Sequence, residues 1–217
     1  MRYNTRTASL IIPFGLATLA GCFSLGRDAP RVQHYVLAGA LPTERATPPL
    51  GLAGLTIGMR RLDLAPYLAT PAIVVRRGTN QIVYSDFHRW SEDPHVGINR
   101  AVAGYLAADT LVRAVDVAPW PVRSQYDFLV QLRVARFEGV APALVPGIEG
   151  EAHLFASWEI IRQHDGAVLA RGVTDYREPG WRVDDHVALV HLLDRGLKAL
   201  AHDLVACLES LQRAGTC

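Results

Sequence analysis

The second half of the chain alternates apolar and polar side chains along two stretches. The segment from Tyr126 to Phe137 alternates, with an apolar side chain at every second position up to Val134. Residues 154–160 repeat the arrangement before Gly166 marks a turn into residues 168–176. This alternation is typical of strands with one buried face. The pattern predicts a three-stranded antiparallel meander, with an apolar loop at residues 139–150. The alternating apolar positions are Phe128, Val130, Leu132, Val134, Leu154, Ala156, Trp158 and Ile160.

The first half of the chain contains four shorter runs that predict strands. The last two runs are β-branched and are separated by Arg77-Gly78-Thr79-Asn80, which favours a hairpin. Residues 41–54 contain three prolines and predict a loop. Pro66 has no N–H and restricts Ala65, so residues 62–68 are expected to be extended or turned. The four runs are residues 32–37, 55–60, 72–76 and 81–84.

Two segments carry the spacing of a helix. Asp93 and Pro94 suit a helix start, and the apolar positions that follow predict four to five turns ending before Asp116. Asp184 or Asp185 is expected to cap a longer C-terminal helix whose leucines form one apolar stripe. The predicted class is therefore α+β, with two layers and a mostly antiparallel sheet packed against two main helices. The stripe consists of Leu189, Leu193, Leu197, Leu200, Leu204, Leu208 and Leu211.

The N-terminus carries a short apolar run that sets the expected compartment. Arg2 and Arg6 precede residues 10–20, which are too few to span a bilayer as a stable helix, and this layout is typical of a secretory signal. The run ends in Leu-Ala-Gly-Cys22, which resembles a bacterial lipobox, so Cys22 is expected to carry lipid. The alternative is an ordinary cleaved signal with an incidental cysteine. The expected organisation is a lipoprotein signal peptide at residues 1–21, a lipidated tether at 22–31 and one periplasmic domain at 32–217.

Composition fits a single domain behind that anchor. Removal of residues 1–21, which contain two arginines and no acid, changes Lys+Arg from 22 to 20 against 21 Asp+Glu. This balance argues against nucleic acid as a partner, because such binding requires a basic surface. No second apolar run approaches the length of a membrane span.

Two cysteines remain if Cys22 is lipidated. In an oxidising periplasm, Cys207 and Cys217 could form a disulfide that would pin the C-terminal tail and add roughly 3 kcal/mol of stability. The other interpretation is a buried Cys207 beside a frayed terminus. The sequence leaves both open.

No arrangement of residues predicts catalysis. The chain has no Gly-x-Ser-x-Gly, no phosphate-binding glycine loop and no Cys-x-x-Cys. Asp184-Asp185-His186 with His191 is the best metal candidate, but side chains five apart diverge on a helix. Helix capping explains these residues better, and turn chemistry explains His164-Asp165-Gly166. We therefore expect a protein that is not an enzyme and that binds no metal and no cofactor other than the covalent lipid.

Three motifs resemble a known family. Tyr35-Val36-Leu37 is followed by a proline-tyrosine segment and then by Arg-Trp-Ser-Glu at the start of a helix, behind the lipobox. This order is similar to that of the ABC-type transport auxiliary lipoproteins, the PqiC-like proteins. Ala65, Thr70 and Asp93-Pro94 depart from the family pattern. The matching positions, expected to contact a partner, are Leu64, Pro66, Tyr67, Leu68, Pro71, Arg89, Trp90 and Glu92.

The resemblance implies a non-catalytic component of a transport system. PqiC-like lipoproteins accompany MCE-domain proteins that move lipids or hydrophobic solutes between the inner and outer membranes. An MCE-domain partner and a homo-oligomer are implied. Phe23 stands where many inner-membrane lipoproteins have aspartate, so the expected location is the periplasmic face of the outer membrane. The alternatives are a lipid-binding carrier and a structural envelope lipoprotein.

Three aromatic residues have two interpretations each. A tryptophan just before a helix, such as Trp90, usually fills a core, but beside Arg89 it would also suit a protein interface. The same choice applies to Tyr67 and Trp120.

Overall fold

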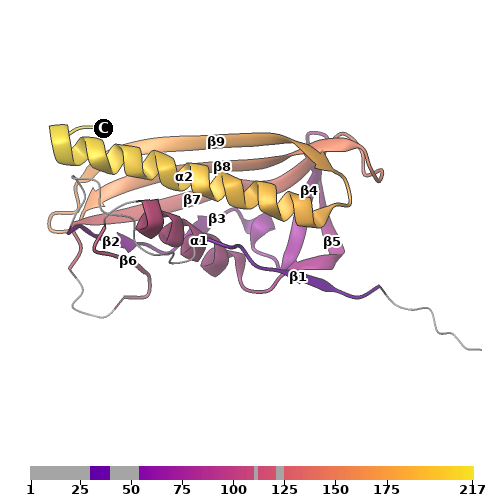
Figure 1. Cartoon of the computed structure of the whole chain (residues 1–217), viewed down its shortest axis with the longest axis horizontal. Coiled ribbons are helices and arrows are strands. Elements are labelled where there is room, and N and C mark those ends of the chain that lie inside the picture. Colours follow the sequence, from indigo (N-terminus) through magenta and orange to yellow (C-terminus); the bar gives the residue numbers. More distant parts are fainter. Residues whose placement is uncertain (1–29, 40–53, 110–111, 121–124) are drawn as a thin grey trace, which may run out of the picture. The chain divides into compact units, whose positions relative to one another are not determined.

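A computed structural model describes residues 30–39, 54–109, 112–120 and 125–217. The predicted signal peptide, Cys22, most of the tether and most of the predicted loop at 41–54 lie outside these residues. Within them, two helices pack against a mixed, curled sheet, which confirms the α+β class (Figure 1). The elements are β1 (Gln33–Tyr35), β2 (Thr56–Met59), β3 (Asp63–Leu64), the 3-10 helix η1 (Pro66–Leu68), β4 (Ala72–Arg77), β5 (Gln81–Trp90), α1 (Pro94–Asp109), β6 (Ala114–Val117), β7 (Phe128–Ala141), β8 (Glu149–Arg162), β9 (Val168–Arg182) and α2 (His186–Ala214).

The sheet is built around β7. The predicted meander is confirmed, because β7, β8 and β9 pair antiparallel in chain order. The predicted hairpin of β4 and β5 is confirmed as well, with Arg77 opposite Gln81. The short strands β2, β3 and β4 all pair with β7 in parallel, and β1 joins β5 in parallel. These parallel contacts were not predicted from the sequence.

A bulge in β7 changes which residues face the helices. Before it, Val130, Leu132 and Val134 have no exposed surface. The register shifts between Val134 and Arg136, so that Phe137 is the next large side chain to enter the core. An extra residue in one strand reverses the alternation beyond it. The shift moves the buried apolar side chains of β7 from even to odd positions.

The helix α2 lies over β7, β8 and β9, and α1 packs against α2 (Figure 1). Asp185 caps α2, since its carboxylate accepts the N–H of Ala188 at 2.9 Å. All seven leucines of the predicted stripe are buried. Gly196 allows close packing, because a Cβ there would lie 3.2 Å from the Cβ of Leu154 and 3.0 Å from the ring of Tyr176. The glycine lets the helix axis approach the sheet.

Two predicted boundaries were wrong. The loop expected at 139–150 covers only residues 142–148, because β7 and β8 continue pairing up to Val140 and Glu151. The strand expected to end at Tyr84 continues to Trp90, because its second half pairs with β1. Neither pairing has a local sequence signal, since each partner lies elsewhere in the chain. None of the described helices is both long and apolar enough to cross a membrane.

Candidate functional site

The three motif segments meet at the end of β5. The N–H of Trp90 donates to the carbonyl of Pro71 at 2.7 Å, and the N–H of Ser91 donates to the carbonyl of Tyr35 at 2.8 Å. Ahead of Pro71, η1 is held to the sheet because the N–H of Ala65 donates to the carbonyl of Val134 at 3.0 Å. The three family segments therefore converge on Trp90, and we call this place the Trp90 junction.

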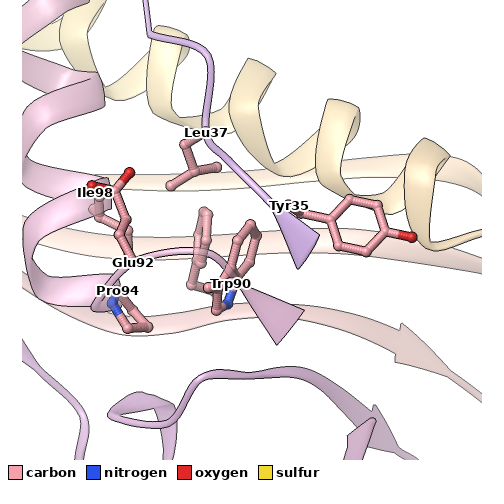
Figure 2. A pocket seen from close by; sticks show the side chains of 8 residues that line it. Tyr35, Leu37, Trp90, Glu92, Pro94 and Ile98 are labelled. Carbon is pink, nitrogen blue, oxygen red and sulfur yellow. The ribbon is translucent and has the colours of Figure 1, made fainter. Parts of the chain in front are cut away.

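On its inner side, Trp90 borders a small apolar cavity (Figure 2). The indole is 8% exposed and stacks against Phe137, with 5.7 Å between the ring centroids. Leu37 and Ile98 also line the cavity, from the segment after β1 and from α1. Its volume is about 10 Å³, about the space that one water molecule needs. Trp90 is thus a core residue, as the first of its two interpretations predicts.

On its outer side, Trp90 borders an open groove of about 400 Å³. Ala69, Thr70 and Pro71 form one wall, and residues 91–95 form the other. Ala69, Pro71 and Ser91 are exposed, so the backbone turns on both sides are accessible from solvent. Both walls belong to the motif segments, and Trp90 separates the groove from the inner cavity.

Two acidic residues fix the wall formed by the start of α1. Glu92 accepts from Arg100 at 2.6 Å, and the same guanidinium donates to the carbonyl of Leu37 at 3.0 Å. Asp93 accepts the N–H of His95 at 2.8 Å, which confirms that it caps α1. This backbone bond, followed by the imidazole contact of His95, lowers the pKa of Asp93. Side-chain contacts therefore connect this wall to the segment after β1 and to the first turn of α1.

A buried ion pair supports the other wall from behind. Glu138 has no exposed surface, and its Oε1 accepts from Nε of Arg76 at 2.5 Å. Arg76 also donates to the hydroxyl of Tyr67 at 3.3 Å, and that hydroxyl donates to the carbonyl of Ala135 at 2.9 Å. Burial, together with the nearby carboxylate of Glu138, raises the pKa of Tyr67 to about 12. This network ties η1 to β4 and β7.

Tyr35, His88 and His186 form a second cluster next to the junction. The rings of His88 and His186 are stacked, with centroids 3.7 Å apart and planes within 3°. Nδ1 of His88 lies 2.9 Å from the hydroxyl of Tyr35. Burial lowers the pKa of both imidazoles, and the charge of His88 adds to the effect on His186. The cluster connects β1 and β5 to the first residue of α2.

Sequence reasoning missed both clusters, although each left a trace. Arg76 ends an otherwise apolar run in β4, and Glu138 is a lone acid beside Phe137 in β7. A charged side chain inside an apolar strand usually requires a partner. No comparable signal links His88 with His186, because they lie 98 positions apart.

The described residues hold no group of three or more His, Cys, Asp or Glu side chains placed to bind a metal. His186 stacks on His88, while His191 is exposed, so the metal candidate considered from sequence is not assembled. Asp185 instead caps α2. His164 and Asp165 lie in the turn between β8 and β9, where Asp165 accepts the N–H of Ala167.

Cys207 and Cys217 are joined by a disulfide. Cys207 is buried on α2, and Cys217 follows the left-handed Gly215 that ends the helix. The bridge attaches the last residues of the chain to the core-facing side of α2.

The predicted contact residues divide into three groups by exposure. Leu64, Leu68 and Trp90 are buried in the core. Tyr67 and Glu92 are half-buried in the networks described above. The exposed residues are Pro66, Pro71 and Arg89.

Trp120, the third aromatic residue with two interpretations, is half-buried against Tyr126, with 5.2 Å between the ring centroids.

Comparison with protein families gives one match, to the family described as "ABC-type transport auxiliary lipoprotein component", over residues 35–205. The chain belongs to this family. The match covers the Trp90 junction, α1, α2 up to residue 205 and the whole sheet apart from the start of β1. A search of the curated proteins found no match. The family is one of auxiliary transport lipoproteins and is not a known enzyme family.

Solved structures share the fold of this auxiliary lipoprotein. A crystal structure of a Xanthomonas campestris protein has a TM-score of 0.66 at 15% identity, and the alignment covers 85% of this chain and 97% of that one. A second crystal structure, of an uncharacterized protein, has a TM-score of 0.62 at 15% identity and covers 81% and 97%. At these identities the likeness concerns the fold alone.

Proposed function

We propose that this auxiliary lipoprotein is a non-catalytic docking component of an MCE-type system that moves lipids or hydrophobic solutes between the inner and outer membranes. The observation that carries the proposal is the convergence of the family's motif segments on one open groove at the Trp90 junction. The groove is accessible; side-chain contacts hold the start of α1 on one side, and the buried Arg76–Glu138 pair holds η1, which precedes the other wall. Such a preformed surface suits a short segment of a partner, because little ordering is needed on binding.

The volumes favour docking over the alternative of a lipid carrier. The apolar cavity beside Trp90 has about 10 Å³, whereas sites for small ligands occupy roughly 300–1,000 Å³. The groove is large enough at about 400 Å³, but it is open to solvent, and Thr70, Ser91 and Asp93 add polar groups to its lining. An acyl chain would find no apolar enclosure in either place.

The remaining parts of the proposal concern location and assembly. Cys22 would carry lipid, and Phe23 beside it favours the periplasmic face of the outer membrane over the inner membrane. An MCE-domain protein would reach the groove from the opposite membrane. A homo-oligomer follows from size, since one domain of this length is too small to surround a conduit. Any ATP hydrolysis would belong to another component of the system.

The test introduces a long side chain into the groove. Ala69 is exposed on the groove wall, and Ala206 is exposed on α2, so Ala69→Arg and Ala206→Arg form a matched pair. We expect Ala69→Arg to reduce co-purification with the MCE protein at least tenfold and Ala206→Arg to leave it unchanged. Both should unfold within about 0.5 kcal/mol of the wild type, as surface substitutions usually do.

Three results would count against docking at the groove. Equal recovery of the MCE protein with both arginine variants would remove the groove as its binding site. Recovery of one lipid per chain from the purified protein, without the MCE protein, would favour the carrier. Normal membrane permeability in cells with a folded Ala69→Arg variant would favour a structural envelope role.

A further inference from the structure

Exposed apolar side chains collect at one end of the sheet. Of the ten large apolar residues that are exposed in the described part of the chain, six flank β1 or lie in the second half of β5, in the β7–β8 connection or in the first turn of α2. We call these six residues the apolar end: Val32, Val36, Phe87, Leu144, Val145 and Val187.

Backbone and ring contacts place these four segments together. In the register of β1 and β5, Gln33 lies opposite His88, so Val32 and Phe87 are the residues immediately before a paired position. His88 stacks on His186, the residue before Val187. The β7–β8 connection reaches the same place, because the N–H of Gly147 donates to the carbonyl of Val183 at 3.2 Å. Figure 1 shows β1, β5 and the start of α2 at the same end of the sheet.

Exposure at the apolar end is high for such side chains. Val36 is 55% exposed, Val145 is 51% and Val187 is 53%. A grouped apolar surface on a folded domain commonly marks an interaction site. Charges of both signs accompany it, including Arg31 and Arg89 against Asp86 and Asp184. The surface therefore has apolar character without a strong net charge.

The position of the apolar end along the chain indicates what covers it. Ten residue steps separate Cys22 from Val32. A fully extended chain of that length spans at most about 36 Å. A lipid on Cys22 would therefore keep Val32 and its neighbours within this distance of the bilayer, whatever path the tether takes. Within the apolar end, Val32 is the residue closest along the chain to the anchor at Cys22.

We propose that the apolar end rests on the lipid surface of the membrane and orients the domain there. The proposal rests on the lipid anchor at Cys22 included in the proposed function. The charges around the apolar end are balanced, and the contact buries apolar side chains at the bilayer interface. The contact should therefore depend little on anionic lipid or on salt. The lipid anchor then supplies attachment, and the apolar end supplies orientation.

The test uses the mature lipidated protein in vesicles of phosphatidylethanolamine and phosphatidylglycerol that contain a photoactivatable phosphatidylcholine. We expect lipid crosslinks within residues 32–36 and 142–148, with equal yield at low and high salt. Val36→Asp combined with Val145→Asp should lower this yield at least fivefold. Val173→Asp is the matched control, because Val173 is 57% exposed on β9 and outside the apolar end.

The outcomes separate this inference from the anchor. Crosslinks confined to residues 22–30, or an equal effect of Val173→Asp, would overturn the contact. Crosslinking of a photoreactive residue at position 145 to a protein in cells, with no lipid adduct in vesicles, would overturn it in favour of a protein interface. The mass of the N-terminal peptide reports lipidation separately. An unmodified Cys22 would overturn both the anchor and this inference. A lipidated Cys22 without crosslinks would overturn this inference alone and leave the docking function standing.

Discussion

Removal of Arg76 tests whether the buried ion pair holds the motif segment in place. In Arg76→Met, Glu138 keeps its charge without the guanidinium that donates at 2.5 Å and at 3.4 Å. Removal of one partner from a buried pair typically costs 3–5 kcal/mol. Arg136 stays at 3.8 Å from the same carboxylate but is 41% exposed, so its compensation is small. We expect a loss of about 3 kcal/mol in the free energy of unfolding.

The matched variants are Glu138→Gln and the double variant. Glu138→Gln leaves a guanidinium that is 13% exposed and retains its bond to the carbonyl of Thr79, so we expect a loss of about 1–2 kcal/mol. The double variant removes both charges. Its loss in the free energy of unfolding should be about 2 kcal/mol smaller than the sum of the two single losses. Urea unfolding followed by circular dichroism measures each value. If the two single losses add up to the loss of the double variant within about 0.5 kcal/mol, the pair is not coupled. That result would refute the account in which the ion pair holds η1 in place.

Three further predictions concern pH, the disulfide and the anchor. The folded state holds His88 and His186 with pKa values below 6.5, so the unfolded chain binds more protons as pH falls below that value. The contribution of the two histidines to the free energy of unfolding is fully present above pH 6.5 and should decline as pH falls from 6.5 to 5. Urea unfolding should show a shallower decline in His88→Phe. Cys217→Ser opens a short loop and should lower the free energy of unfolding by up to about 3 kcal/mol in urea. Cys22→Ala should shift the folded protein out of the outer-membrane fraction and abolish transport.

Each of these predictions has a result that contradicts it. An identical pH slope in His88→Phe would show that the stacked imidazoles do not set the acid sensitivity. Unchanged stability of Cys217→Ser relative to Ser210→Ala, a control on the exposed side of α2, would show that the bridge does not stabilise the fold. Transport that survives Cys22→Ala would show that the tether is dispensable.

The elements that could be predicted have local causes. Alternation along β7 and β8, the leucine stripe of α2, and Asp93 and Asp185 as caps all depend on residues within a few positions of one another. Such patterns follow from the geometry of a strand or a helix. The same reasoning identified the motif residues but not their burial. Leu64 and Trp90 would each suit either the core or a contact surface, and only their neighbours in the fold decide between the two.

The sequence alone determined the class of the fold, the order of its main elements and the resemblance to auxiliary transport lipoproteins. The tertiary structure decided the parallel pairing of β2, β3 and β4 with β7, the assignment of Trp90 to the core and the groove that Trp90 separates from it. It also decided that Arg76 meets Glu138 and that His88 meets His186. The physical reason is distance along the chain: hydrophobic period and capping act between neighbours, whereas burial and charge pairing depend on residues 62 and 98 positions apart that only the folded sheet brings together.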